Sequence, residues 1–594
     1  MRETETILGM IRERGTKGLH LERVYRLLFN RQLYLRAYGR LAPNKGAMTA
    51  GATPETVDGM CVAKIDAIID DLRHERYRWT PVRRTYIPKK NGKLRPLGIP
   101  TWSDKLLQEV IRSILEAYYE PQFSPHSHGF RAGRGCHTAL GEINRNWSGT
   151  TWFIEGDIKG CFDNIDHQVL LSTLAEKIHD NRFLRLLANL LKAGYLEDWR
   201  YGQTLSGTPQ GGVISPLLAN IYLDRLDKFV AGVLAPAYNR GAKRQLNRDW
   251  LRVYGKAQYL ARTGRRHEAK VMRRQAQTLP CFDVADSGFR RLRFIRYADD
   301  FLLGFSGPRS EAEEIKRQLG EFLRDHLRLE LSAAKTLITS ARAEAAHFLG
   351  YEIVVLQDND KLTHGRRAIN GNVGLRVPAE VIKAKCQTYQ KRGKPVHRPQ
   401  LLQASDYTIL AQYQTEFRGL AQYYQLAYNV CHLNRLKWVM EQSLTKTLAA
   451  KLKLSVQKVY ARYGTVLQTA NGPRKGLQVV VERPGKRALV AQWGGISLRR
   501  RKQAVLDDQP PSVYNGRTEL LERLLADTCE LCGSSANVEV HHVRALKDLE
   551  RRGRAARPEW ARLMATRHRK TLVVCRPCHR DIHAGRLDGR EVVE

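Results

Sequence analysis

The sequence predicts an α+β protein of several domains, and three observations support this. Two apolar runs flank the adjacent carboxylates Asp299 and Asp300, which is the pattern of a β-hairpin with acids at its tip. Residues 375–465 lack strand alternation and are rich in tyrosine, leucine and basic residues, which indicates a helical domain. At 594 residues the chain is too long for one core, so three or four domains are expected.

The charge of the chain indicates a polyanionic partner. The formal net charge is +39, which favours nucleic acid. An acidic membrane surface is the alternative, but no apolar run approaches the roughly 20 residues of a membrane span, and no membrane association is expected. The first residues show no signal-peptide or transit-peptide pattern. A cytoplasmic, nucleoid-associated protein is therefore expected.

The first 100 residues divide into a helical part and a basic hairpin. Within residues 1–80, Thr53-Pro54-Glu55 predicts a helix start, with Thr as N-cap and Pro at the first helical position. Residues 81–100 predict two strands joined at Asn91-Gly92. The cations of this hairpin include Lys89 and Arg95. They are either solvated or hold a triphosphate, which needs several positive donors at once.

A second acid and two glycine-rich segments precede the Asp299-Asp300 hairpin. A strand-like run ends at Asp157, which becomes a metal-ligand candidate only if an acid-bearing hairpin pairs beside it. Residues 126–138 combine glycines with arginines, and residues 207–223 predict a polar turn followed by a helix opened at Ser215-Pro216. Glycines let backbone approach a phosphate chain or a base, and arginines neutralise phosphates.

Two further regions are candidates for nucleic-acid contact. Residues 232–290 predict a basic helical insertion, with twelve Lys or Arg against two acids between Arg240 and Arg274. That excess of one sign favours a nucleic-acid backbone over a solvated helix face. The aromatic residues within 375–465 suit RNA or duplex binding, although a helical bundle with core tyrosines fits equally well. Residues 470–520 predict a basic linker with a small β element from Gln478 to Glu482.

The last 70 residues carry the most specific local pattern, two CxxC pairs interleaved with histidines. Four thiolates can close a tetrahedral zinc site. One strand histidine and two histidines four apart on a helix can hold a single cation, and the neighbouring strand histidine can activate water. The residues concerned are Cys529, Cys532, Cys575 and Cys578, with His541-His542 on the strand and His579 and His583 on the helix.

These segments, in this order, resemble the protein encoded by a mobile group II intron, which joins a reverse transcriptase, a maturase and an HNH endonuclease in one chain. The resemblance covers nearly the whole length. The segments that carry it are Asn44–Thr49, Lys89–Pro100, Gly129–His137, the Asp157 strand, Pro209-Gln210-Gly211-Gly212, Tyr297-Ala298-Asp299-Asp300, Lys335, Phe348-Leu349-Gly350, the helical region and the Cys/His tail.

The resemblance implies a right-hand polymerase with fingers and palm, a helical thumb/maturase domain and a small zinc-stapled ββα-metal HNH domain. The implied activities are copying of intron RNA by target-primed reverse transcription, help in splicing of that RNA, and nicking of target DNA for retrohoming. The implied domains are an N-terminal extension (1–80), fingers and palm (81–365, with the insertion 232–290), thumb/maturase (366–470), a basic DNA-binding or linker region (471–524) and the nuclease (525–594).

The resemblance also assigns roles at the polymerase site. Asp157 and Asp299 bridge two Mg²⁺ ions, and Asp300 supports them. Phe162 lies under the sugar and excludes a 2′-hydroxyl, which favours dNTPs. The residues implied to contact the dNTP are Lys89, Arg95, Phe162, Gln210 and Lys335, the last as a general acid or as a simple phosphate contact.

For the tail, the resemblance implies four structural Zn²⁺ ligands, Cys529, Cys532, Cys575 and Cys578, with His542 as the general base. His541, His579 and His583 would hold a divalent cation, expected to be Mg²⁺. The Asn that gives the HNH motif its middle letter is missing, and Arg569-Lys570-Thr571 occupies that region. The expected partners are intron RNA, target DNA and dNTPs.

Three other classes of protein fit the sequence less well. A non-catalytic RNA-binding splicing factor would not need intact Asp157 and Asp299. A reverse transcriptase of another bacterial retroelement would lack the helical domain and the Cys/His tail, and Phe162 disfavours an RNA-dependent RNA polymerase.

Overall fold

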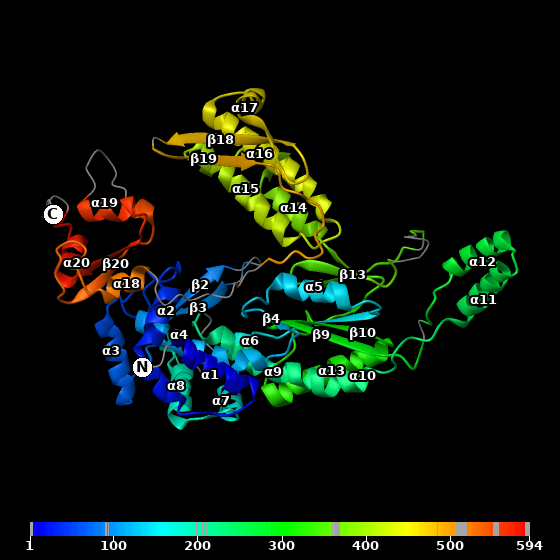
Figure 1. The fold of residues 1–594 in the computed structure, drawn as a ribbon, viewed down its shortest axis with the longest axis horizontal. Coiled ribbons are helices and arrows are strands. Elements are labelled where there is room, and N and C mark those ends of the chain that lie inside the picture. The colour runs from blue at the N-terminus through cyan, green and yellow to red at the C-terminus, as the bar shows by residue number, and fades with distance from the viewer. Residues whose placement is uncertain are drawn as a thin grey trace.

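The computed structural model shows a helical N-terminal region, two β-sheets that form the centre of the molecule, a helical domain above them and a small domain at the C-terminal end (Figure 1). No described helix is long and apolar enough to span a bilayer. The residues that the structure describes are 4–88, 92, 94–197, 200–202, 207, 211–283, 286–358, 360–361, 369–483, 485–506, 519–549 and 558–587.

The N-terminal helices pack on the long helix α4 (Trp102–Tyr119), with α1 along one side of it. The predicted helix start at Thr53 is wrong, because α3 begins only at Val62. The preceding loop bonds to a distant strand: the Gly59 amide donates to the carbonyl of Val540. The other helices are α1 (Thr4–Thr16), η1 (Val24–Phe29), α2 (Arg31–Leu41) and α3 (Val62–Arg73).

The predicted basic hairpin is present as β2 (Val82–Pro88) and β3 (Leu94–Ile99). These strands pair antiparallel, with Arg83 opposite Ile99 and Pro88 opposite Leu94. They belong to a four-stranded sheet in the order β3-β2-β7-β8, completed by β7 (Tyr195–Glu197) and β8 (Arg200–Gly202). Of the residues predicted at the hairpin tip, Lys89 and Asn91 lie outside the described part of the chain.

The central sheet has five strands in the order β11-β5-β10-β9-β4. Alternate residues of β10 enter two different cores: Leu303 packs with α9 and α13, whereas Leu302 packs with α5 on the other face. Helix α9 opens at Ser215-Pro216, as predicted. The elements are β4 (Ser127–His128), β5 (Trp152–Asp157), β9 (Arg291–Tyr297), β10 (Asp300–Ser306), β11 (Ile338–Ser340), α5 (Cys136–Asn146), α9 (Ser215–Phe229) and α13 (Arg309–Leu327).

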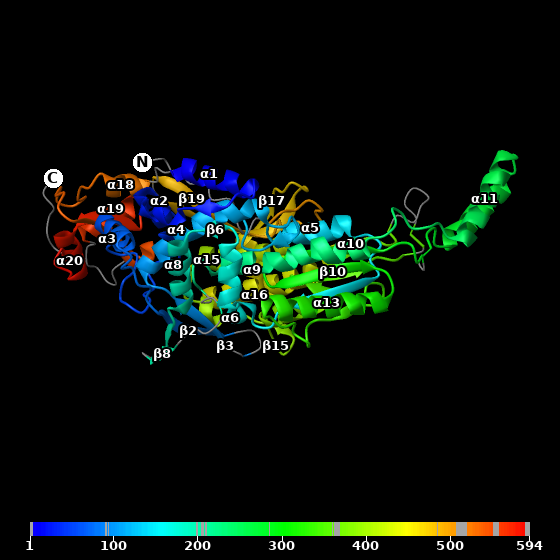
Figure 2. The same cartoon turned by 90° about the horizontal axis from the view of Figure 1, so that it is seen from below.

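Shorter helices follow β5, and the insertion projects from the far end of the sheet. The elements near β5 are α6 (Cys161–Asn164), α7 (His167–Ala175) and α8 (Asn181–Lys192). The predicted insertion is helical: α11 (Arg248–Arg262) and α12 (Arg266–Thr278) pack together as an arm that extends away from the body (Figure 2). Helix α10 (Ala235–Tyr238) and the π-helix η3 (Val230–Leu234) link α9 to this arm.

The helical domain has a sheet packed on it. Tyr413 and Phe417 of α15 are buried against Trp493 of β19, so these aromatic residues form core. The β element expected at 478–482 is one strand of a three-stranded sheet, and the predicted boundary at 470 falls inside that sheet. The elements are α14 (Ala379–Gln387), α15 (Asp406–Tyr423), α16 (Asn434–Leu452), α17 (Val456–Tyr463), β17 (Gly464–Leu467), β18 (Arg474–Arg483) and β19 (Lys486–Trp493).

A second three-stranded sheet follows the central sheet in the chain and contacts it, and a ββα unit forms the tail. The joining strands are β12 (Ala346–Phe348), β13 (Tyr351–Val355) and β14 (Val373–Arg376). In the tail, β20 (Val538–His542) pairs antiparallel with β21 (Thr571–Cys575), and α20 (Arg576–His583) follows. Helices α18 (Glu519–Leu525) and α19 (Glu559–Thr566) flank this unit.

Candidate polymerase and nuclease sites

Three carboxylates meet at one end of the central sheet. Asp157 is the last residue of β5 and lies directly opposite Asp300, the first residue of β10. Asp299 and Ala298 form the turn between β9 and β10, and Ala298 has a positive φ of 54°. The acid-bearing hairpin therefore pairs beside the Asp157 strand, which is the condition that made Asp157 a metal-ligand candidate.

Burial and the negative charges of the neighbouring carboxylates raise the pKa values of Asp299 and Asp300. Desolvation and the negative charges of Asp299 and Asp157 raise the pKa of Asp300 to about 6. Desolvation and the charge of Asp157 also raise the pKa of Asp299, while the positive charges of Arg95 and Lys335 oppose that rise. Carboxylates that repel each other in a partly desolvated site form a donor set suited to a hard divalent cation.

Lys335 lies within this cluster. Its Nζ donates to both carboxylate oxygens of Asp157 at 3.0 Å. The loop that carries it is fixed to the same strand, because the Ser332 amide donates to the carbonyl of Asp157 at 2.8 Å. The positive charge of Lys335 therefore offsets the negative charge of Asp157.

A buried arginine supports the turn that carries Asp299. The guanidinium of Arg296 in β9 is fully buried and donates to both oxygens of Asp227, at 2.8 and 2.7 Å. It also donates to the carbonyl of Ala298 at 2.8 Å and to Asn220 Oδ1 at 3.1 Å. Asn220 and Asp227 belong to α9, so this network ties the turn to the helix beneath the sheet.

The structure describes some of the residues expected to contact the dNTP and not others. Phe162 lies on α6, just beyond Asp157. Its ring is edge-on to that of Phe130, with the ring centroids 6.3 Å apart. Arg95 lies on β3, and its charge acts on Asp299. Lys89 and Gln210 lie outside the described residues.

The glycine-rich segments have structural uses that the sequence did not reveal. Gly211 has a φ of 109°, and a Cβ there would lie 2.6 Å from the carbonyl oxygen of Gly98, so this turn packs directly on the hairpin strand β3. Arg131, in the segment expected to neutralise phosphate, is instead buried and bonds to Glu120 and to the carbonyl of Ser127. Its charge is therefore satisfied within the protein.

The four tail cysteines form one cluster. Their Sγ atoms all lie within 4.8 Å of one another, and Cys532 Sγ is 3.6 Å from Cys575 Sγ. Thiolates bound about 2.3 Å from a tetrahedral zinc ion stand about 3.8 Å apart, so the donors fit this ion. The four residues are Cys529, Cys532, Cys575 and Cys578.

The tail histidines form a second cluster. His579 Nε2 lies 3.1 Å from His541 Nδ1 and 3.1 Å from His583 Nε2. Glu539 Oε1 lies 2.7 Å from His579 Nδ1, an outer contact that leaves Nε2 facing the cluster. Although burial opposes it, Asp58 and Glu539 raise the pKa of His579 to about 9. Asp58 itself, from the N-terminal loop, completes this cluster.

The two adjacent strand histidines have different surroundings, as alternation along a strand requires. His541 contacts the rings of His579 and Trp560. His542 is buried, and its Nε2 lies 2.9 Å from the hydroxyl of Tyr38 in α2. Burial lowers the pKa of His542 to about 4. His542 also pairs through its backbone with Thr571, in the region where the HNH Asn is missing.

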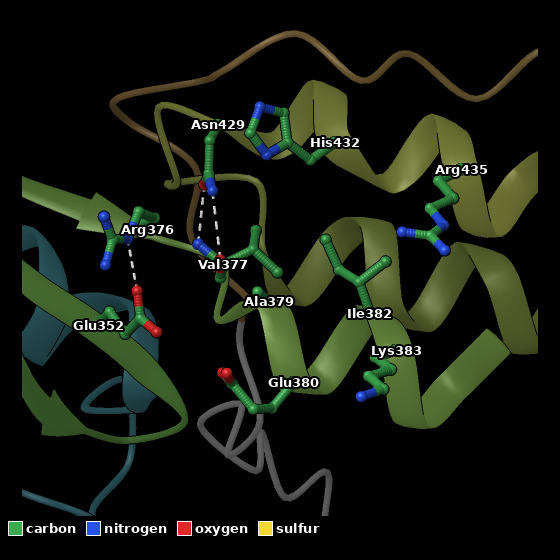
Figure 3. Close-up of a pocket in the computed structure, with 10 residues that line it drawn as sticks. All are labelled: Glu352, Arg376, Val377, Ala379, Glu380, Ile382, Lys383, Asn429, His432 and Arg435. Carbon is green, nitrogen blue, oxygen red and sulfur yellow. Dashed lines mark hydrogen bonds and ion pairs between the residues drawn. The ribbon is translucent and has the colours of Figure 1, made fainter. Parts of the chain in front are cut away.

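A cavity of about 980 Å³ lies elsewhere, between β13–β14 and helices α14 and α16 (Figure 3). Two pairs of lining residues are bonded to each other: Arg376 bonds to Glu352, and Asn429 bonds to the backbone of Val377. It contains none of the predicted site residues. It is lined by Glu352, Arg376, Val377, Ala379, Glu380, Ile382, Lys383, Asn429, His432 and Arg435.

Sequence reasoning missed four supporting residues, and only one had a local signal. Glu539 lies two residues before His541 on the same strand, so alternation places both side chains on one face. Arg296, Asp58 and Tyr38 act through partners that are distant in the chain, and nothing in their neighbourhoods indicates those partners.

Comparison with known proteins finds three families along the chain. Residues 87–246 match the family model described as reverse transcriptase (RNA-dependent DNA polymerase). Residues 379–479 match that of the type II intron maturase, and residues 529–579 match that of the AI2M/AI1M-like HNH endonuclease. The first match contains Asp157 but ends inside the basic insertion, before Asp299.

Several curated proteins are similar over nearly the whole chain. The group II intron-encoded protein LtrA of Lactococcus lactis subsp. cremoris is 39% identical, over 98% of this chain and 99% of its own length. The uncharacterized 91 kDa protein in the cob intron of Schizosaccharomyces pombe is 34% identical over 94% of this chain and 69% of its own. The putative COX1/OXI3 intron 2 protein of Saccharomyces cerevisiae is 30% identical over 96% and 66%. The chain therefore belongs to the group II intron-encoded proteins, as a multifunctional enzyme with reverse transcriptase, maturase and HNH endonuclease domains.

Proposed function

We propose that Asp157, Asp299 and Asp300 form the centre at which this protein copies intron RNA into DNA. The observation that carries the proposal is the β5–β10 register, which sets Asp157 opposite Asp300 with Asp299 in the adjoining turn. Asp157 and Asp299 would hold two Mg²⁺ ions, with Asp300 in support, because carboxylates are the oxygen ligands that Mg²⁺ prefers. Mg²⁺ held there would supply activation of the primer 3′-hydroxyl and charge stabilisation for the leaving pyrophosphate.

The cations around the carboxylates would hold the nucleotide. Arg95 already acts on Asp299 through its charge, and the turn at Gly211 packs against the strand that carries Arg95. Lys335 would exchange Asp157 for a phosphate of the dNTP, since its side chain is largely exposed and tethered only by that ion pair among the contacts described. Lys89 and Gln210 remain proposed contacts on the strength of the resemblance.

Phe162 would select the sugar. It follows Asp157 by five residues and is half-buried, packing against the main hydrophobic core and edge-on to the ring of Phe130. A rigid ring beneath the sugar leaves no room for a 2′-hydroxyl, which favours dNTPs over ribonucleotides.

The tail would nick the target DNA. His541, His579 and His583 would hold one divalent cation, and His542 would act as the general base once its ring is accessible. Three imidazoles suit a transition-metal ion such as Zn²⁺ better than the Mg²⁺ expected from the resemblance. Cys529, Cys532, Cys575 and Cys578 would bind a structural Zn²⁺, because their four Sγ atoms lie within 4.8 Å of one another and thiolates are preferred ligands of this ion.

The resulting 3′-hydroxyl would prime reverse transcription, so the two centres would act in sequence during retrohoming. The basic arm of α11 and α12, with Trp250 stacked on Tyr254 at 4.6 Å, would contact intron RNA and assist its splicing. A protein with these substrates would act at the nucleoid.

Substituting Asp299 by Ala tests the polymerase assignment. The variant should lose primer extension on an RNA template while it retains affinity for intron RNA, because the change removes a metal ligand and no basic surface. Asp325→Ala is the matched control, since Asp325 is an exposed carboxylate paired only with the adjacent Arg324 among the contacts described. Primer extension near the wild-type rate by Asp299→Ala would refute the assignment and favour a non-catalytic splicing factor.

A further inference from the structure

The N-terminal region supplies a carboxylate to the histidine cluster of the nuclease domain. Asp58 Oδ2 lies 2.8 Å from His583 Nε2, and Asp58 Oδ1 lies 3.2 Å from His579 Nε2. His541 Nδ1 is 3.4 Å from the same oxygen Oδ1. The backbone amide of His542 donates to Oδ1 at 2.7 Å, which fixes the orientation of the carboxylate. A residue 484 positions away in the chain thus completes the site.

The four donors lie close enough together to share one cation. Their contacts run from 2.8 Å, for Asp58 Oδ2 and His583, to 3.4 Å, for Asp58 Oδ1 and His541, which is close to the edge of about 3.3 Å of a tetrahedron around a cation bound at about 2.0 Å. Catalytic sites of this kind use three protein ligands and keep one position open, whereas four protein ligands mark a closed site. Asp58 therefore lies at the position that a water molecule or a DNA phosphate oxygen needs.

The same region covers the residue expected to act as general base. His542 is only 5% exposed, and its ring meets the ring of Tyr38 edge-on with centroids 6.1 Å apart. The hydroxyl of Tyr38 lies 2.9 Å from His542 Nε2. The hydroxyl of Tyr38 therefore takes the hydrogen-bonding position that a water molecule would need at this nitrogen.

Backbone bonds and an apolar core hold the two regions together. The Gly59 amide donates to the carbonyl of Val540 at 3.0 Å, and the Val540 amide donates to the carbonyl of Met60 at 2.9 Å. Met60 and Val540 are fully buried in one core that both regions share. In Figures 1 and 2, α18 of the tail lies beside α2.

We propose that Asp58 is the fourth ligand of the nuclease metal, so that one shared cation holds the nuclease domain closed against the N-terminal region. The inference rests on the proposed role of the three histidines. Opening would be a ligand exchange: the Asp58 carboxylate leaves the metal as an anionic phosphate oxygen of target DNA binds, and the charge at the metal is conserved. Cleavage then requires the loop at residues 53–60 to withdraw.

Asp58→Ala tests this, with Asp70→Ala as the matched control because Asp70 is an exposed carboxylate of α3 that pairs with Arg76. The first measurement is amide hydrogen exchange of the full chain bound to intron RNA, with and without added Mn²⁺, a harder ion that leaves the thiolate site to zinc. In wild type and in Asp70→Ala, Mn²⁺ should slow exchange in peptides covering 54–61 and 538–542. In Asp58→Ala, the factor by which Mn²⁺ slows exchange at 54–61 should be about tenfold smaller than in wild type. This difference corresponds to ~1.4 kcal/mol in the free energy of opening.

The second measurement is single-turnover nicking of target DNA at saturating Mn²⁺. Asp58→Ala should nick several-fold faster than wild type, because a larger fraction of molecules is open. Slower nicking would overturn the inference, since Asp58 would then belong to the active centre. Asp58→Asn keeps the shape of the side chain and guards against misfolding of the alanine variant. It should shift both measurements in the same directions, and unchanged values would overturn the inference.

The failure of this inference differs from the failure of the proposed nuclease site. His583→Ala removes an exposed member of the histidine cluster. If it still nicks at the wild-type rate, the proposed metal site itself is wrong. If it is inactive while Asp58→Asn behaves as wild type in both measurements, only the shared-ligand inference fails.

Discussion

Substituting Arg296 by Met should loosen the hairpin that carries Asp299. The guanidinium is fully buried and makes five side-chain hydrogen bonds, two of them to Asp227, whose side chain is also fully buried. Removing one partner of a buried ion pair leaves an uncompensated charge and costs about 3–5 kcal/mol. Because ~1.4 kcal/mol is a factor of ten in an equilibrium constant, local opening should become roughly 100- to 4,000-fold more frequent.

Amide hydrogen exchange of peptides covering β9 and β10 measures this opening directly. Arg309→Met is the control, because Arg309 is 64% exposed and pairs with Glu313 on the surface, so exchange should change little. The double variant Arg296→Met with Asp227→Asn removes both charges and should recover part of the loss. Unchanged exchange in Arg296→Met would refute this prediction. So would a double variant whose loss in the free energy of opening equals the sum of the losses in the two single variants.

Two other predictions concern the sugar contact and the cysteine cluster. Phe162→Val should admit ribonucleotides in primer extension, because the smaller side chain frees space beneath the sugar, and an unchanged dNTP/NTP preference would exclude Phe162 as the selecting residue. Cys532→Ser should lower the zinc content measured by atomic absorption and increase hydrogen exchange across 529–583, because zinc binding contributes to the folding of such domains, while primer extension persists. Full zinc content in this variant would contradict the four-thiolate site.

Local patterns predicted the parts of the sites that lie close together in the chain or alternate along a strand. The apolar runs beside Asp299 and Asp300 predicted their hairpin, and the spacing of His579 and His583 predicted that they share a helix face. The CxxC pairs likewise predicted one cluster. Each of these patterns follows from the period of a single element or from a short turn.

Long-range contacts account for what the sequence did not reveal. The rule that Thr-Pro-Glu starts a helix failed at Thr53, because the backbone beyond it bonds to Val540 instead of forming a helical turn. Arg296 looked like one more cation in a basic chain, yet its partners lie on α9. Tyr413 fitted an RNA-binding surface as well as a core, and only the packing of Trp493 decided between them.

The most direct test of two separate active centres is a target-primed reaction by the intron ribonucleoprotein, with nicking and extension followed in the same sample. Asp299→Ala should nick target DNA at the wild-type rate and leave the 3′ end unextended. His583→Ala should leave the target intact but extend a primer already annealed to the RNA. Loss of both activities in either variant would contradict the account, since it would mean that one centre depends on the other for its structure.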